Sequence, residues 1–481
     1  MNILFLGKST PTREVIWIKA LKKVNPILKI DIVEFSERSF LELEKDISDK
    51  KIEKLINSKI SFINFVLKNY KEYDLKTENE IIQQLKFYEE KYKMNYNFIL
   101  NCDRTIIYYK KKKIKILLLL LTIFSERIIL ENNYTKIIGE FSSSSDIIFY
   151  TLAKFYEIEY KSFCHGRIEN RISIENIDGN RSGLAEKYLE LKKRNFTQNE
   201  KKILKEYFKK ISVGDIIPDY EKYNKKLRKF SIILELKKMR KNLKNIIRTY
   251  GNDSKYSCDL PNFLKKKIEF KWNQIKYPLK KYLEKGIWEE INYNERFLLV
   301  PLHFTPEVTT MTFAQEYLDQ IHHIKRLSQS IPIDYCLYVK EHPSMYIYRK
   351  KSYYDEIKKL HNVKLISPFE NQLQLLKSSM GVITLTNTTG YEGILYKKPV
   401  YLFGKVFYQE YDFVNKIKSY SELKELITKN ENYQIEQHNY ESFILATLLS
   451  LKEGNYNLVT LDPTALSDEN GINIAKIILE E

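Results

Sequence analysis

Two short polar segments in the second half of the chain have the composition of a phosphate-binding site. Residues 340–343 read Lys-Glu-His-Pro, and residues 386–390 read Thr-Asn-Thr-Thr-Gly. Each follows an apolar run typical of a buried strand, and a helical pattern begins at the end of the second. Backbone N–H groups and the dipole at the start of a helix attract phosphate. Threonine hydroxyls and a histidine N–H add further donors.

We therefore expect these two segments to hold a phosphate, with Gly390 allowing the ligand to approach closely. The other contacts would come from Lys340, His342, Thr386, Thr388 and Thr389. Simpler interpretations exist for each segment. Thr388 or Thr389 could cap the helix, which stabilises it by about 1 kcal/mol, and a single loop histidine is often structural.

The elements that carry these segments predict one parallel sheet. Apolar runs typical of strands occupy residues 297–302, 335–339, 363–366, 381–385 and 400–403, with helical patterns between them. Ligands of open parallel sheets bind beyond the carboxyl ends of the strands. Residues 303–307, 340–343 and 386–392 all follow strands directly, so their polar groups should converge on one crevice.

The first half of the chain also alternates strands with helices. We expect strands at residues 2–6, 27–35, 97–102 and 136–140, with helices between them, including residues 78–94. Residues 181–290 are rich in Lys and Arg and poor in strand signals. The expected domains are therefore 1–180, a helical basic connector or insertion at 181–290, and 291–481.

The bulk composition limits the class of protein. The 481 residues carry a formal net charge of +18, which suits a polyanionic partner, although a low-GC genome would produce the same excess of lysine. The four cysteines form no CxxC pair, which argues against zinc and disulfides. The apolar run at 116–124 is well short of the ~20 residues of a membrane-spanning helix. We expect a soluble cytoplasmic protein, whose basic connector is either a solvated surface or a contact with anionic membrane.

The motifs of residues 296–410 resemble those of bacterial capsule and surface polysaccharide biosynthesis proteins. The segments that carry the resemblance are 301–307 (Pro-Leu-His-Phe-Thr-Pro-Glu), 339–343 (Val-Lys-Glu-His-Pro), 362–366 (Asn-Val-Lys-Leu-Ile), 386–393 (Thr-Asn-Thr-Thr-Gly-Tyr-Glu-Gly), 398–400 (Lys-Pro-Val) and 403–404 (Phe-Gly). This group is similar to the Kdo transferases of capsule assembly. More distantly, it shares the His-Pro and Ser/Thr-loop features of bacterial sialyltransferases.

The resemblance implies an α/β protein of the GT-B class, in which two Rossmann-like domains face a cleft. It also implies a nucleotide-sugar donor, often a CMP-sugar, held by the C-terminal domain. His342 and the loop from Thr386 to Gly390 would hold the donor phosphate, and Glu392 would lie near the ribose. The Kdo transferases carry Gln and Asp after the first C-terminal strand, where this chain reads His303 to Glu307, so the donor sugar does not follow from the resemblance.

A transferase of this class also needs a carboxylate that deprotonates the acceptor or acts as nucleophile. Glu140, at the end of the strand at 136–139 and before a run of serines, is the first candidate, and Glu307 is the second. Asp146 is expected to serve the dipole of the following helix. His165 and Arg167 are candidates for contact with acceptor or phosphate. No DxD motif stands out, so neither a metal nor a cofactor besides the donor is expected.

The function expected from the sequence is transfer of a hexose or ulosonic acid from a nucleotide-sugar, with a CMP-sugar favoured, to a surface polysaccharide or glycolipid. A polyol-phosphate transferase of the teichoic-acid type and a non-hydrolysing nucleotide-sugar epimerase are alternatives with similar folds. A basic nucleic-acid-binding protein is the non-enzyme alternative. The chain contains no recognisable nucleic-acid motif, so nucleic acid is not an expected partner.

Overall fold

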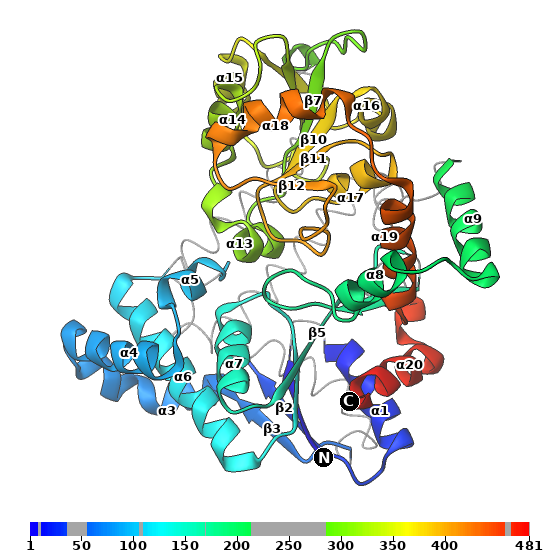
Figure 1. Ribbon diagram of the computed structural model, residues 1–481. Helices are drawn as coiled ribbons and strands as arrows, with labels where there is room; N and C mark the ends of the chain where they lie inside the picture. The colour runs from blue at the N-terminus through cyan, green and yellow to red at the C-terminus, as the bar shows by residue number, and fades with distance from the viewer. Residues whose placement is uncertain are drawn as a thin grey trace, which may run out of the picture. The chain divides into compact units, whose positions relative to one another are not determined.

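The protein consists of two compact α/β units, each built on its own sheet (Figure 1). The computed structural model describes residues 1–7, 11–35, 55–104, 109–168, 170–212, 285–456 and 463–480. Unit 1 contains the described residues of 1–175 and 451–480, and unit 2 contains those of 176–212 and 285–450.

The sheet of unit 1 has seven strands in the order β13-β6-β5-β4-β1-β2-β3. The strands from β3 to β5 are parallel, whereas β6 and β13 are antiparallel additions. Because the chain runs from β1 to one side and then returns to β4 on the other, the strand order reverses between β1 and β4. The strands are β1 (Asn2–Gly7), β2 (Lys29–Glu34), β3 (Ser58–Ser61), β4 (Lys136–Gly139), β5 (Glu159–His165), β6 (Arg171–Ile174) and β13 (Lys452–Glu453).

Helices cover this sheet, and the last helix of the chain packs against the first (Figure 1). The apolar run at 116–124 lies in α6, where residues 116–121 are buried. The helices of unit 1 are α1 (Pro11–Val24), α3 (Phe62–Leu75), α4 (Glu78–Tyr92), α5 (Tyr96–Asn101), α6 (Lys111–Asn132), α7 (Ser144–Phe155), α20 (Asp468–Leu479) and the 3-10 turn η6 (Pro463–Leu466). No helix in the described ranges is long and apolar enough to cross a membrane.

The sheet of unit 2 has six parallel strands in the order β12-β11-β10-β7-β8-β9. This is the doubly wound order of a Rossmann fold, in which the strand order reverses between β7 and β10. The strands are β7 (Phe297–Pro301), β8 (Cys336–Lys340), β9 (Val363–Ile366), β10 (Gly381–Thr384), β11 (Val400–Leu402) and β12 (Val414–Lys416). Most of their residues are buried, because helices cover both faces of such a sheet.

Unit 2 also includes two helices that precede its sheet in the sequence. Tyr207 of α9 shares a hydrogen bond with Tyr391 of α17, and the Tyr396 hydroxyl donates to the carbonyl of Ile211 at 3.1 Å. The helices are α8 (Leu184–Lys192), α9 (Gln198–Ser212), α13 (Val308–Phe313), α14 (Gln320–Ser328), α15 (Lys351–Lys358), α16 (Gln372–Ser378), α17 (Thr388–Leu395), α18 (Leu423–Lys429), α19 (Gln437–Ser450) and the 3-10 turns η2 (Lys285–Ile287), η3 (Gln315–Tyr317), η4 (Tyr420–Glu422) and η5 (Asn430–Asn432).

The predicted α/β class with two Rossmann-like domains is confirmed, and most predicted strands are present within one or two residues. The strand expected at 97–102 is wrong, because these residues lie in helix α5. The Asn95 side chain caps that helix by accepting a bond from the Phe98 N–H at 2.9 Å, and only one side of the helix is buried.

The expected domain limits differ from the observed units at two places. Residues 176–212 pack with unit 2, and residues 451–480 return to unit 1. Most of the basic connector expected at 181–290 lies outside the described residues.

Candidate functional site

The carboxyl ends of β7, β8 and β10 bring three of the predicted polar segments together in unit 2. The loops after β7 and β10 lie on either side of the point where the strand order reverses, which is where open α/β sheets bind ligands. His303 joins these two loops, since its Nε2 accepts a hydrogen bond from the Thr386 N–H at 3.2 Å. Strand ends that are distant in sequence are therefore held next to each other by direct contacts.

His303 is buried in the candidate site and is hydrogen-bonded to residues of the loops after β8 and β10. The carbonyl of His303 accepts bonds from Arg349 at 2.7 Å and from Gln320 at 3.2 Å, and its ring is buried. Burial is the main cause that lowers the pKa of His303 to about 3, and repulsion from the Arg349 guanidinium and from the protonated forms of His323 and His342 adds to it. The ring is therefore neutral at physiological pH, which leaves Nε2 free to accept the Thr386 bond.

A buried ion pair fixes the loop after β8. The carboxylate of Glu341 is fully buried and receives bonds from Arg349 at 2.6 Å, from the Tyr354 hydroxyl at 2.9 Å and from the His342 N–H at 2.5 Å. Lys340 is also buried, and its ammonium group donates to the carbonyl of Pro368 at 3.3 Å. Both cations at this strand end thus already have partners inside the protein.

The ring of His342 is held as a neutral hydrogen-bond donor. Its Nδ1 accepts a bond from the Ser344 N–H at 3.2 Å, so the proton of the neutral ring resides on Nε2. Burial, followed by the charges of Arg349 and Lys340, lowers the pKa of His342 to about 4. Phe304 packs edge-on against this ring with 6.0 Å between centroids. The histidine can therefore offer an oriented N–H to an anionic oxygen.

The N-terminus of α17 is capped by Asn387, so neither Thr388 nor Thr389 is the capping residue. The Asn387 side-chain oxygen accepts bonds from the Thr389 N–H at 3.0 Å and from the hydroxyls of Thr388 and Thr389 at 3.1 Å each. The Thr389 hydroxyl also receives a bond from Gln372 at 2.9 Å. Both threonine hydroxyls are thus oriented by neighbouring side chains.

Thr386 is the threonine of this loop whose hydroxyl is left unsatisfied. Its backbone N–H is already bonded to His303, but its Oγ1 is buried and has no hydrogen-bond partner among the residues that the structure describes. A buried hydroxyl without a partner costs about 1–3 kcal/mol. Such a group at the reversal point of the sheet is well suited to bind a ligand oxygen.

Gly390 has a packing role in the structure, and the approach of a ligand to this glycine stays a prediction. A Cβ atom at this position would lie 2.2 Å from the Tyr408 hydroxyl and 2.8 Å from Cγ2 of Thr384. The Tyr408 hydroxyl donates to the Asn387 carbonyl at 3.0 Å. Glycine is therefore needed here so that Tyr408 can reach and brace the cap of α17.

Two predicted carboxylates lie near the same loops of unit 2. Glu307 directly precedes α13 and is half-buried, without a side-chain cap bond to that helix. Glu392 lies one turn into α17 and is also half-buried. Glu392 therefore lies on the helix that begins within the segment at 386–390, and Glu307 lies on the loop between β7 and α13.

In unit 1, Glu140 and His165 are brought together by a tyrosine that the sequence did not indicate. Glu140 follows β4 at the reversal point of this sheet, and its carboxylate accepts a hydrogen bond from Tyr456. The ring of His165, at the end of β5, lies edge-on to Tyr456 with 5.5 Å between centroids. Tyr456 comes from the segment after β13, more than 300 residues from Glu140, so no local motif could have identified it.

The loop after Glu140 is shaped by Asp146. This carboxylate is buried and accepts bonds from the Ser142 N–H at 3.2 Å, the Ser142 hydroxyl at 3.0 Å and the Ser143 hydroxyl at 2.8 Å. Asp146 therefore organises the turn into α7. Arg167, on the turn after β5, is half-buried and has a positive φ of 64°.

Over the ranges that the structure describes, no group of three or more His, Cys, Asp or Glu residues could hold a metal ion.

Part of the chain matches the model of a known protein family. Residues 211–414 match a model of the capsule polysaccharide biosynthesis protein family, so the resemblance expected from the sequence is confirmed over that segment. No curated protein sequence matches the chain significantly.

Several solved structures of bacterial proteins have a limited similarity to this chain, with TM-scores below 0.5. Two of them are structures of KpsC from Thermosulfurimonas dismutans. Its β-Kdo 2,7 transferase is 11% identical, with 73% of this chain and 88% of that chain covered and a TM-score of 0.33. Its β-Kdo 2,4 transferase is 14% identical, with 72% and 87% covered and a TM-score of 0.36. A UDP-GlcNAc 2-epimerase from Neisseria meningitidis is 13% identical, with 93% and 100% covered and a TM-score of 0.24.

Proposed function

We propose that the protein is a glycosyltransferase of capsule or surface polysaccharide biosynthesis that uses a CMP-sugar donor. The observation that carries this proposal is the set of neutral donors at the reversal point of the unit 2 sheet. This set consists of the Nε2–H of His342, the unsatisfied hydroxyl of Thr386 and the N-terminus of α17. The match of residues 211–414 to capsule polysaccharide biosynthesis proteins supports the same assignment.

The charge of the site favours a donor with one phosphate. Lys340 and Arg349, the two cations at the end of β8, are occupied by the Pro368 carbonyl and by Glu341. A sugar linked to CMP has a single phosphodiester with one negative charge, which neutral N–H and O–H donors can bind together with a helix dipole. A pyrophosphate carries more charge, for which proteins commonly provide arginine, lysine or a metal ion.

In the proposed reaction, the carboxylate of Glu140 takes the proton from the attacking acceptor hydroxyl. The acceptor oxygen forms a bond to the anomeric carbon, the bond from that carbon to the phosphate oxygen breaks, and CMP leaves with the electron pair. Tyr456 would position the carboxylate through their hydrogen bond. This is the role that the family resemblance implies for a carboxylate of the first domain. Glu392 would bind the ribose, and Glu307 is the second candidate for the carboxylate. His165 and Arg167 would contact the acceptor.

Nucleotide binding is the first test. CMP at millimolar concentration should raise the melting temperature of the protein, and His342→Ala should weaken CMP binding by about tenfold to a hundredfold, the loss expected for one hydrogen bond to a charged group. His361→Ala is the matched control, because His361 is an exposed histidine of the same unit. Absence of any CMP-induced shift in the wild-type protein would count decisively against the proposal.

Donor turnover is the second test. The release of nucleotide from CMP-, UDP-, GDP- and CDP-activated donors should be greatest with a CMP-sugar. Glu140→Gln should lower that turnover by about a hundredfold or more, the usual range for loss of a general base, while leaving CMP binding unchanged. Turnover of CDP-glycerol alone would instead indicate a polyol-phosphate transferase, and interconversion of a UDP-sugar without acceptor would indicate an epimerase.

A further inference from the structure

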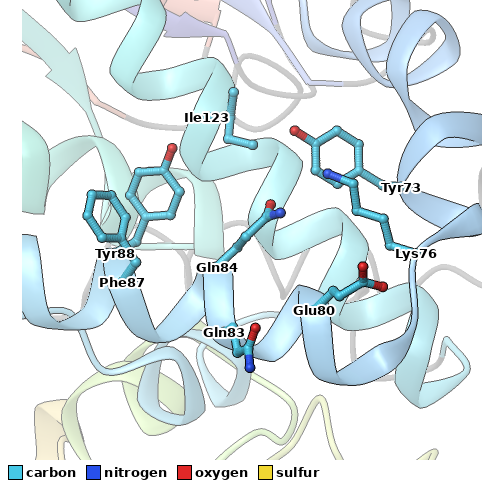
Figure 2. Close-up of a pocket in the computed structure, with 8 residues that line it drawn as sticks. All are labelled: Tyr73, Lys76, Glu80, Gln83, Gln84, Phe87, Tyr88 and Ile123. Carbon is cyan, nitrogen blue, oxygen red and sulfur yellow. The ribbon is translucent and has the colours of Figure 1, made fainter.

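A hollow of about 640 Å³ lies on the helical side of unit 1, between α3, α4 and α6 (Figure 2). Its volume is within the range of about 300–1,000 Å³ that is usual for ligand sites. It shares no lining residue with the small cavity at Glu140 and Tyr456. The hollow is therefore separate from the residues to which the reaction has been assigned.

Aromatic side chains stand at both ends of the hollow. Figure 2 shows Phe87 and Tyr88 at one end and Tyr73 at the other, with the side chain of Gln84 between them. Phe87 is 58% exposed, so much of its ring is available for contact. Its ring packs edge-on against Tyr88 with 5.3 Å between centroids, and the Tyr88 hydroxyl donates to Glu126 at 3.3 Å. These contacts hold both rings in fixed orientations.

The charged groups of the hollow are already compensated. Lys76 lies over the ring of Tyr73 at 4.1 Å and pairs with Glu72 at 3.7 Å. Glu80 accepts bonds from the N–H of Thr77 at 2.6 Å and from its hydroxyl at 2.7 Å, as part of the capping box of α4. Recognition in this hollow must therefore depend on aromatic faces and uncharged polar groups.

Two glutamines supply those uncharged groups. The side chains of Gln83 and Gln84 line the hollow, and within the described part of the chain neither amide makes a hydrogen bond. Each amide offers two N–H donors and one carbonyl acceptor. A sugar hydroxyl both donates and accepts, so it matches an amide better than a purely anionic or cationic group does.

We propose that this hollow binds a segment of the glycan chain that serves as acceptor, at a distance from the reacting end. A pyranose ring has an apolar C–H face and a rim of hydroxyls. Phe87 and Tyr73 would bury the apolar faces of sugar rings, and Gln83 and Gln84 would bond to the hydroxyls. The inference rests on the proposed glycosyltransferase function, and it adds a second contact with the same substrate.

Binding of glycan fragments to the full-length protein tests this inference. The probe is the surface polysaccharide of the producing bacterium, cut by mild acid, separated by size and labelled at the reducing end. Fluorescence polarisation would measure its affinity. We expect Phe87→Leu and Gln84→Ala to weaken binding by about tenfold each, the effect of losing one ring contact or one satisfied hydrogen bond. Phe87→Tyr keeps the aromatic face and should bind as the wild type does.

Matched controls separate this site from nonspecific effects. Phe155→Ala removes another exposed aromatic ring of unit 1, outside the hollow, and should leave the affinity unchanged. Melting temperatures would verify that each variant is folded. The affinity should also change little as salt increases, because screening weakens only contacts between charges. A steep fall with salt would show instead that lysines bind an anionic chain elsewhere, and would overturn the inference.

The outcome can be separated from that of the proposed function by measuring CMP binding in the same variants. CMP should shift the melting of the Phe87 and Gln84 variants as it does that of the wild type. If CMP binds but the wild-type protein binds no fragment, or if Phe87→Leu binds fragments as tightly as the wild type, the inference is wrong. If fragments bind in the hollow but no nucleotide binds, the glycan site stands and the proposed transferase function fails.

Discussion

The protonation state of His342 determines how the proposed phosphate site responds to pH. Burial and two nearby cations lower its pKa to about 4, so the imidazole is uncharged across the physiological range. Donation from Nε2 needs no additional proton, because Ser344 occupies Nδ1. In the proposed site, an anion would bind through an oriented N–H, and protonation of this ring would contribute little to affinity at neutral pH.

The affinity for a CMP-sugar should therefore vary by less than about twofold between pH 6 and pH 8, where neither His342 nor the phosphodiester of the sugar nucleotide changes charge. Isothermal titration calorimetry at several pH values would measure this directly. A steep loss of affinity as the pH rises through about 6.5, the pKa of an unperturbed histidine, would mean that an imidazolium binds the phosphate.

Glu34 should make the stability of unit 1 depend on pH. It ends β2, is buried, and has no partner for either carboxylate oxygen. Burial is the main reason that the pKa of Glu34 is raised to about 8. The negative charge of Glu14 adds to this effect, and the positive charge of Lys59 opposes it. The folded state therefore keeps a proton that the unfolded chain releases above its ordinary pKa of 4.5. Stability should fall as the pH rises from about 4.5 to 8, by about 1.4 kcal/mol per pH unit.

Urea unfolding at pH 5, 6, 7 and 8 would measure this dependence. Glu34→Gln should flatten the profile and stabilise the protein at pH 8, because the amide has no charge to bury. Glu72→Gln, at an exposed glutamate of the same unit, should leave the profile unchanged. Parallel profiles for the wild type and Glu34→Gln would show that Glu34 does not ionise in this range.

At the residue scale, the sequence indicates which segments contribute to the candidate site, but it does not indicate which hydrogen bonds and packing contacts their side chains make. The strand ends at 340–343 and 386–390 are recognisable because polar residues follow apolar runs directly. The contacts that define them come from outside these segments: Arg349 holds Glu341 in the first loop, and Tyr408 fills the space beside Gly390. Nothing in the local pattern indicates such partners, so the packing of Tyr408 against Gly390 could not be predicted from the sequence.

At the element scale, the loop after β8 depends on the buried pair of Glu341 and Arg349. Removing one partner of a buried ion pair leaves an uncompensated charge and costs about 3–5 kcal/mol. Arg349→Ala should therefore destabilise unit 2 by that amount in urea unfolding. It should also weaken CMP binding, because Glu341 accepts a bond from the His342 backbone and Arg349 holds the His303 carbonyl.

Two variants control this prediction. Lys351→Ala breaks the exposed pair with Asp355 on α15 and should cost less than about 1 kcal/mol. The double variant Glu341→Gln/Arg349→Met removes both charges while keeping a hydrogen-bond acceptor, and should recover part of the lost stability. If Arg349→Ala is no more destabilising than Lys351→Ala, the ion pair does not fix the loop.

The elements themselves were largely predictable, because buried parallel strands form short apolar runs between helices. The runs at 363–366 and 136–139 illustrate this, since they form β9 and β4 with almost the predicted limits. The apolar run at 97–102 has the same appearance but folds as α5, because the Asn95 cap and burial of one side favour a helix. A short apolar run does not by itself distinguish the two structures.

At the scale of the whole molecule, the chain returns to its first unit at the end. Helix α20 packs on α1, and the ammonium groups of Lys136 and Lys161 donate to the carbonyl of Glu480. The same segment supplies Tyr456 to Glu140. Residues 468–479 form a helix, but nothing in their sequence indicates which sheet this helix covers. The expected domain of residues 291–481 therefore includes a final segment, from residue 451, that belongs to unit 1 in the structure.

The two units should unfold separately, and two core substitutions can test this. Ile474 of α20 and Leu423 of α18 are both fully buried, the first in the core of unit 1 and the second in that of unit 2. Truncating either to alanine should cost about 2–5 kcal/mol. Hydrogen exchange followed by mass spectrometry should show faster exchange in β1 and α1 for Ile474→Ala, and in β7 and β8 for Leu423→Ala. CMP should slow exchange in unit 2 alone, since all the proposed phosphate contacts lie there. If either variant accelerates exchange equally in both sheets, the units form one cooperative structure and the final segment stabilises the whole protein.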